Sequence, residues 1–160
     1  MLKENTNMWL YIPGTRRLIR VAPSQRLLGE TSNGDVVGAS FRKNYDAKIY
    51  GEESIVGKEY WILKLTAKYP SVTYSSVKVW MEKYAGNKPF KSEFYSRSKR
   101  LLKTAYYKEY KFYEGELKLH KLLLVDALMK DSYTWMRFDD YRLEVLDAAI
   151  FQKESLGRLN

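Results

Sequence analysis

Hydrophobic and polar residues alternate along much of the chain with the period of two that is typical of β-strands. The clearest case is residues 59–66, where Trp61, Leu63 and Leu65 fall on one face and further apolar side chains occupy the other. A strand that is apolar on both faces belongs in the middle of a sheet, because both of its faces need cover. We therefore expect paired strands on both sides of this segment.

The same pattern predicts a series of strands connected by polar turns. Residues 7–12 and 16–21 read as a hairpin, in which Gly14 of Pro13-Gly14-Thr15 is expected to supply the unusual backbone angle of the turn. Turns recur about every 8–14 residues without a long helical stretch between them, which favours an antiparallel meander over β-α-β units. The chain is therefore predicted to be mainly β, with about nine strands in one curved sheet. The other predicted strands cover residues 46–55, 59–66, 75–83, 90–95, 101–113, 117–129 and 133–139.

Two segments break the strand pattern. Between residues 22 and 44, Ser24 and Ser32 are candidate N-caps for two short helices or turns, at about 24–28 and 33–40. The tail, residues 143–160, spaces apolar residues for a short helix or turn packed against the sheet. A sheet of this size tends to curl on itself and can enclose one small ligand.

Length, charge and composition narrow the functional classes. The 160 residues fit one domain, and the net charge of +9 permits an anionic partner without choosing among nucleic acid, lipid headgroups and acidic proteins. The absence of cysteine excludes disulfides, thiolate metal sites and cysteine nucleophiles. No apolar run approaches the roughly 20 residues that span a bilayer. The first residues lack the apolar core of a signal peptide, so the chain is either cytoplasmic or begins after an export signal; its early entry into a strand favours the second.

No signature of an enzyme, a metal site or a cofactor site is present. His120 is the single histidine and is expected to be structural. Asp139 and Asp140 would point to opposite faces if their strand continued, so they could not act together on one substrate. The glycines lack the spacing of a phosphate-binding loop.

Residues 99–121 interleave cations with aromatic rings, which is compatible with binding single-stranded nucleic acid. We favour a strand with one packed or groove-lining face, because one of its two sets of alternate residues, those that share a face, is mostly aromatic and apolar. The chain contains 14 Tyr, 6 Phe and 4 Trp, more than a sheet with little helix needs for its core, so a partner or an apolar ligand is expected to cover one face. The favoured set is Leu102, Thr104, Tyr106, Lys108, Tyr110 and Phe112.

Three consecutive motifs carry a family resemblance. Residues 7–13 read NMWLYIP, residues 16–21 read RRLIRV and residues 24–29 read SQRLLG. They resemble the N-M-W-L-Y-x-P, R-x-I-R and S-x-R-x-x-G pattern of bacterial outer-membrane lipoprotein-sorting proteins of the LolA-like superfamily. Later strand segments agree in order, so the resemblance extends over residues 7–159.

The resemblance implies a non-enzymatic periplasmic carrier with a strongly curved antiparallel sheet, an unclosed barrel. Short helices would form a lid over an apolar concavity that receives the acyl chains of a lipid or lipoprotein. Membrane sorting components would be further partners, whereas nucleic acid and cofactors are not expected. Relatives carry an export signal, a helix and first strands before the first motif, so residues 1–160 are expected to be one LolA-like domain lacking its N-terminal portion. The family has no catalytic residues to transfer, and its gating arginine is not matched.

The resemblance leads to a cavity hypothesis, although parity alone does not choose between the two sheet faces and each residue could be ordinary core. An interaction or sensor module that uses the sheet surface, and a basic nucleic-acid binder, are the alternatives. The predicted lining is Trp9, Tyr11, Trp61, Leu63, Leu65, Val77, Val79 and Met81, the predicted lid is Leu27, Leu28, Val36 and Val37, and the predicted headgroup residues at the rim are Arg16, Arg17 and Arg20.

Overall fold

The computed structural model describes residues 2–4, 7–22, 26–28, 31–32, 41–84, 86 and 88–155. They divide into two units, one formed from residues 1–39 and 142–160 and the other from Ser40–Tyr141. The strands are antiparallel throughout, and all nine predicted strands are present together with three shorter ones. The predicted mainly β fold is therefore confirmed.

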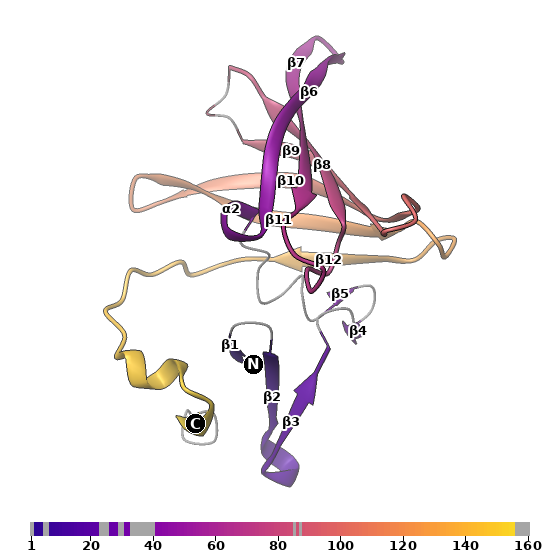
Figure 1. Cartoon of the computed structure of the whole chain (residues 1–160). Helices are drawn as coiled ribbons and strands as arrows, with labels where there is room; N and C mark the ends of the chain where they lie inside the picture. Colours follow the sequence, from indigo (N-terminus) through magenta and orange to yellow (C-terminus); the bar gives the residue numbers. More distant parts are fainter. Residues whose placement is uncertain are drawn as a thin grey trace. The chain divides into compact units, whose positions relative to one another are not determined.

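The larger unit is a seven-stranded sheet whose strands follow one another in the order of the sequence. Its outer strands, β6 and β12, do not pair with each other among the described residues, so the sheet remains open. Strand direction turns strongly across it, from the upright β6 and β7 to the nearly horizontal β11 and β12 (Figure 1). This arrangement confirms the predicted open, curved antiparallel meander. The elements are α2 (Phe41–Asn44), β6 (Tyr45–Ile55), β7 (Lys58–Ala67), β8 (Ser76–Glu82), β9 (Pro89–Tyr95), β10 (Leu101–Tyr113), β11 (Glu116–Asp126) and β12 (Tyr133–Arg137).

The two faces of this sheet differ in chemistry. On one face, which we call the aliphatic face, the strand register brings apolar residues of neighbouring strands opposite one another. The other face, which we call the lysine face, carries Lys48, Lys64 and Lys78, which lie opposite one another on the neighbouring strands β6, β7 and β8. Six residues of the aliphatic face are at most 7% exposed, whereas Lys48 and Lys64 are exposed. The aliphatic face consists of Trp61, Leu63, Leu65, Val77, Val79, Met81, Phe94, Ala105 and Leu124.

The smaller unit contains the predicted N-terminal hairpin. β2 and β3 pair so that Met8 lies opposite Val21, and both side chains are buried. The turn between them differs from the expectation, because the positive φ belongs to Arg16 (50°) and not to Gly14. The short 3-10 turn uses Pro13–Thr15, and the left-handed residue follows it. The elements are β1 (Leu2–Glu4), β2 (Asn7–Ile12), η1 (Pro13–Thr15), β3 (Arg17–Val21), β4 (Arg26–Leu28), β5 (Thr31–Ser32), η2 (Ala148–Phe151) and η3 (Lys153–Ser155).

The segments predicted to be helical differ most from the structure. The helix or turn expected at residues 24–28 is wrong for its described part, since residues 26–28 form strand β4 and pair with β5. So short a segment does not nucleate a stable helix, because the first helical turn fixes several residues for a single hydrogen bond. Pairing with β5 supplies hydrogen-bond partners for its backbone instead. The second expected helix, residues 33–40, lies outside the described residues. The tail forms two 3-10 turns, and its Leu143 and Leu146 are 93% and 49% exposed, so they do not pack as expected.

The parity prediction for the stretch that becomes β10 is wrong in part, because Thr104 of the predicted packed set is 9% exposed but residues of the opposite parity are buried as well. The register between β10 and β11 shifts on both sides of Glu109, which breaks strict alternation along the strand. Lys103 and Ala105, outside the predicted packed set, are 6% and 1% exposed, whereas Phe112, within it, is 74% exposed. A bulge of this kind leaves no clear mark in the sequence pattern.

Candidate functional site

Six of the eight predicted lining residues come together on the aliphatic face. They form three directly opposed pairs between β7 and β8: Trp61 with Met81, Leu63 with Val79, and Leu65 with Val77. Because side chains alternate along a strand, all six lie on the same side of the sheet. The structure thus places these six residues on one face of the sheet.

Three residues that the sequence analysis missed extend this apolar surface across β9, β10 and β11. Val77 lies opposite Phe94, and Ala105 lies opposite Leu124 on the next strand. These three side chains are 7%, 1% and 3% exposed. The aliphatic face therefore runs over five neighbouring strands, a span that no single strand pattern could indicate.

The helical cover within this unit is small. Of the described helices only the four-residue α2 belongs to it, and a single turn cannot cover the apolar side of a seven-stranded sheet. Phe41 of α2 packs edge-on against Tyr45, with ring centroids 5.7 Å apart. This contact lies at one end of the face, beside the start of β6.

The polar groups on the aliphatic face include a buried lysine, since Lys103 is 6% exposed and lies opposite Phe94 and Asp126. The hydroxyls of Ser92 and Tyr107 lie 3.0 Å apart, and Ser92 is fully buried. The hydroxyl of Tyr45 donates to the carbonyl of Tyr74 over 3.0 Å. Burial raises the pKa of Tyr45 to about 12, so this phenol is neutral at any physiological pH. The hydroxyls of Ser92, Tyr107 and Tyr45 are thus held by hydrogen bonds.

One end of the face carries a cation. The ammonium of Lys83 lies 4.0 Å from the centre of the Trp61 ring and also pairs with Glu52. The hydrogen bond with Glu52 raises the pKa of Lys83, so the side chain stays charged. The lysine ammonium therefore makes a cation–π contact with the tryptophan at this end of the face.

The other predicted lining residues belong to the smaller unit and are not part of this group. Trp9 and Tyr11 lie on β2 and are half-buried, with the ammonium of Lys153 4.1 Å from the centre of the Trp9 ring. Of the predicted lid, Leu27 and Leu28 lie on strand β4 and not on a helix. Val36 and Val37 lie outside the described residues.

The three arginines predicted as a headgroup rim do not gather on one side. Arg16 occupies the turn, while Arg17 and Arg20 are three positions apart on β3 and so point to opposite faces. Arg20 lies opposite Trp9 and Arg17 opposite Ile12. All three side chains are exposed.

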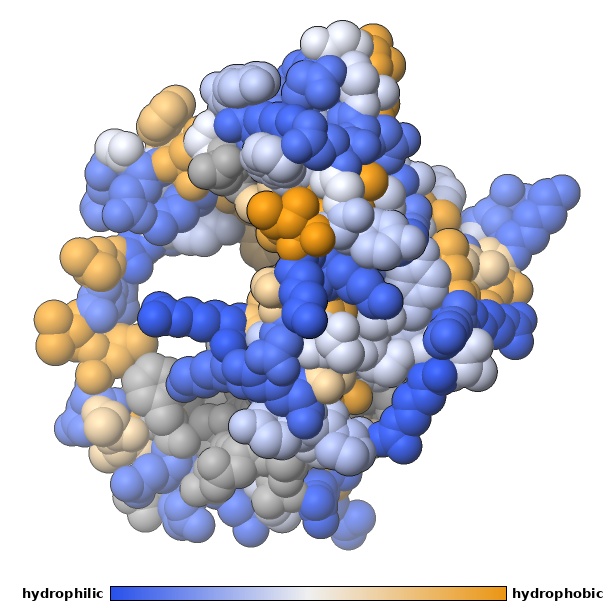
Figure 2. Space-filling model, turned by 45° about the horizontal axis from the view of Figure 1, so that its top comes forward, coloured by the Kyte–Doolittle hydropathy of each residue, from blue (hydrophilic) through white to orange (hydrophobic). Residues whose placement is uncertain are grey.

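A separate pocket of about 410 Å³ lies at the other end of the sheet, between β11, β12 and the turn that joins them. Its strand residues, including Leu123 opposite Trp135 and Val125 opposite Tyr133, belong to the lysine face. Tyr133 and Trp135 are 61% and 55% exposed. On the side of the molecule drawn in Figure 2, hydrophobic residues (orange) lie between hydrophilic ones (blue). None of the predicted lining residues takes part in this pocket. Its lining is Leu123, Val125, Asp131, Ser132, Tyr133 and Trp135.

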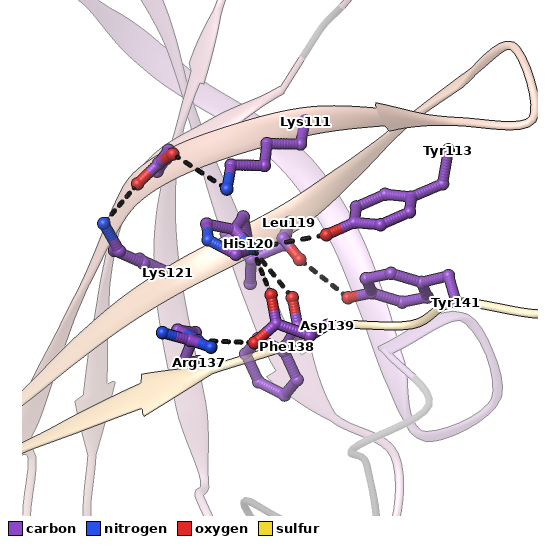
Figure 3. Close-up of polar contacts among 10 residues, drawn as sticks. Lys111, Tyr113, Leu119, His120, Lys121, Arg137, Phe138, Asp139 and Tyr141 are labelled. Carbon is purple, nitrogen blue, oxygen red and sulfur yellow. Dashed lines mark hydrogen bonds and ion pairs between the residues drawn. The ribbon is translucent and has the colours of Figure 1, made fainter.

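The single histidine serves as a structural clamp (Figure 3). His120 is 3% exposed, and its Nδ1 donates to the carbonyl oxygen of Phe138 over 2.9 Å. Because a carbonyl only accepts, Nδ1 carries the proton. Asp139 lies 3.2 Å from the same nitrogen and also pairs with Arg137. These contacts attach the segment after β12 to β11.

The two aspartates do not form a catalytic pair. The strand ends at Arg137, before either of them, so the strand geometry assumed for them does not apply. Asp139 is engaged by His120 and Arg137, while Asp140 has a left-handed backbone with φ of 54°. In the part of the chain that the structure describes, no group of three or more His, Asp or Glu side chains could hold a metal ion, and no helix could cross a membrane.

Comparison with known proteins adds family evidence to this geometry. A family model described as "Uncharacterized protein" matches residues 1–158. A LolA superfamily protein from Nitrosomonas europaea is 34% identical, with a TM-score of 0.84 over 95% of this chain and 69% of that one. A domain named for outer membrane lipoprotein sorting, from Vibrio parahaemolyticus, is 25% identical, with a TM-score of 0.81 over 95% of this chain and 66% of that one.

A more distant structure shares the fold alone. A DUF1329 family protein from Desulfovibrio piger is 22% identical, with a TM-score of 0.81 over 94% of this chain and 64% of that one. The chain therefore spans about two thirds of the length of these structural relatives. A search of curated proteins gives no match.

Proposed function

Because the chain belongs to the LolA superfamily, we propose that it is a non-enzymatic carrier that binds the acyl chains of a lipid or lipoprotein on the aliphatic face. The observation that carries this proposal is that apolar side chains of the five strands from β7 to β11 lie on one face, with Ser92 and Lys103 among them. The fold of the relatives supports a lipoprotein-sorting or lipid-carrier protein. We extend the proposal to outer-membrane lipoprotein sorting in the periplasm.

The physical basis of binding would be the removal of methylene groups from water, which contributes about 0.8 kcal/mol for each buried CH₂. An aliphatic surface makes no directional contacts, so affinity would depend on chain length more than on the headgroup. A chain that binds in this way must be admitted by movement of side chains or segments that cover the face, because six of its residues are at most 7% exposed. Anchored hydroxyls such as those of Ser92 and Tyr107 fit a site that binds without reacting.

The half-buried Leu63 offers the best position for a test. Leu63→Trp adds bulk to the centre of the aliphatic face, whereas Thr66→Trp adds the same ring to an exposed position on the lysine face. We expect Leu63→Trp to weaken binding of an acylated peptide at least tenfold, and Thr66→Trp to leave it within about twofold. The readout is displacement of a fluorescent fatty acid, supported by mass spectrometry of lipid that co-purifies with the wild-type protein.

The proposal fails if delipidated wild-type protein unfolds at the same temperature with and without saturating acylated peptide, because any ligand that binds the native state raises that temperature. It also fails if both tryptophan variants bind the peptide as the wild type does. Either result would favour a protein interaction module that uses the sheet surface. Variants that unfold well below the wild type are replaced by the smaller change Leu63→Phe.

A further inference from the structure

The lysine face contains a row of three lysines that the strand register brings side by side. Lys48 of β6 lies directly opposite Lys64 of β7, and Lys64 lies directly opposite Lys78 of β8. Directly opposed residues have Cβ atoms about 4.5–5.5 Å apart. Lys48 and Lys64 are exposed and Lys78 is half-buried. We call Lys48, Lys64 and Lys78 the lysine row.

No acidic side chain neutralises this row among the described residues. Glu93 comes next across the sheet, opposite Lys78, but its carboxylate accepts from Lys91 over 3.0 Å and from the hydroxyl of Tyr95 over 2.6 Å. Asp46, two positions before Lys48, pairs with Lys68 at 3.5 Å. The nearest carboxylates are therefore committed to other cations.

The contact that the row does make is with an aromatic ring. The ammonium groups of Lys64 and Lys78 lie 5.9 and 5.0 Å from the centre of the Tyr50 ring. Tyr50 itself is 61% exposed. One exposed tyrosine and two flanking lysines thus share a surface, which is the combination found where proteins meet the headgroup layer of a membrane.

Like charges placed directly opposite each other in a sheet lower stability. The lysine row contains two such contacts in succession, at positions where a polar uncharged residue would serve a solvated sheet face equally well. An anionic surface would convert this repulsion into attraction. We propose that the lysine row docks the protein on the surface of an anionic phospholipid bilayer.

The geometry favours a bilayer over a polynucleotide. The ring of Tyr50 is already engaged by two ammonium groups instead of being free to stack on a base. A bilayer requires only a field of phosphates that several long side chains can reach at once. Docking through this face is independent of acyl binding, because the aliphatic face is the opposite side of the same sheet.

The test is flotation with vesicles that contain phosphatidylglycerol, compared with vesicles of phosphatidylcholine alone. The wild-type protein is expected to bind the anionic vesicles and not the neutral ones, and to lose binding as salt screens the charges. Near an anionic surface each lysine contributes roughly a fivefold change in partition, so Lys48→Gln/Lys64→Gln/Lys78→Gln should bind about a hundredfold more weakly. The matched control, Lys43→Gln/Lys99→Gln/Lys130→Gln, removes the same charge from exposed lysines of α2 and two turns, and is expected to lose less than fivefold.

Three results would overturn the proposal: equal losses in the two triple variants, equal binding to neutral vesicles, or binding to a single-stranded oligonucleotide without binding to vesicles. Misfolding is excluded as a cause if the triple variant of the lysine row unfolds at or above the wild-type temperature at low ionic strength, which is expected because it removes both repulsive contacts. The variant Leu63→Trp is expected to float with anionic vesicles as the wild type does. Loss of acyl binding and loss of docking are thereby separated.

Discussion

Charged residues in the larger unit are mostly held by a near neighbour across a strand or turn. Glu109 accepts from Lys121 over 2.6 Å, and this hydrogen bond holds the pKa of Glu109 below its usual value. Such pairs are exposed to solvent and stabilise the fold only slightly. The exception with a structural consequence is Asp139, because its carboxylate also faces the buried His120.

The first prediction at this scale concerns the pH dependence of stability. The hydrogen bond from Arg137 lowers the pKa of Asp139 from its usual 3.8. A carboxyl whose pKa is lower in the folded state stabilises the protein above its unfolded pKa and loses that effect as pH falls through the folded value. We therefore expect Asp139→Asn to lower the free energy of unfolding at neutral pH and to flatten its decline below about pH 4.

Urea unfolding of Asp139→Asn at a series of pH values measures this effect. Asp140→Asn is the matched control, because Asp140 is adjacent and its left-handed backbone is also tolerated by asparagine. An equal flattening in both variants would contradict the role assigned to the Arg137–Asp139 pair.

At the scale of single elements, one of two similar hairpin turns contains a residue that fits its backbone poorly. Val56-Gly57 connects β6 to β7, and Glu114-Gly115 connects β10 to β11; both residues of each turn have positive φ, as in a type I′ turn. Valine is a poor residue for that backbone, since its branched side chain crowds the left-handed conformation. Its side chain is 98% exposed, so it gains nothing from packing.

We therefore predict that Val56→Asn stabilises the protein by about 0.5–1 kcal/mol, because Asn-Gly is the preferred pair for a type I′ turn. Thermal unfolding would show this as a rise of a few degrees in the midpoint. Val145→Asn provides the control, as Val145 is equally exposed and is not among the described residues with positive φ. A fall in the midpoint for Val56→Asn would mean that the valine makes a contact not evident from its exposure.

The sequence predicts elements well where the signal is local. The nine strands follow from alternation and turn residues, which act within a few positions of each other. Segments 24–28 and 143–160 were harder, because their apolar residues fit both helix and strand and no tertiary contact is visible in the sequence. The sequence did not predict β-bulges. The register shift at Glu109 depends on the pairing of β10 with β11, and Phe112 beyond it is exposed where the sequence pattern predicts burial.

At the scale of the whole molecule, six of the fifteen predicted site residues come together because they lie on two consecutive strands with a simple register. Trp61, Leu63 and Leu65 alternate without interruption, and so do their partners on β8. Phe94, Ala105 and Leu124 could not be assigned, since only the pairing of β8 with β9, of β9 with β10 and of β10 with β11 brings them onto that face. The lysine row was missed for the same reason: each lysine looks solvated on its own strand, and only the register reveals their proximity.

The two faces together make a prediction about transport. If acyl chains bind the aliphatic face and the lysine row docks the bilayer, transfer of a fluorescent acylated peptide between vesicles should depend on both. Leu63→Trp should slow transfer between vesicles of any charge, because it prevents loading. The triple lysine variant should slow transfer only between anionic vesicles, reducing it to the rate between neutral ones, because it removes docking alone. Slower transfer by the lysine variant between purely phosphatidylcholine vesicles would contradict this division, since docking through charge has no role there.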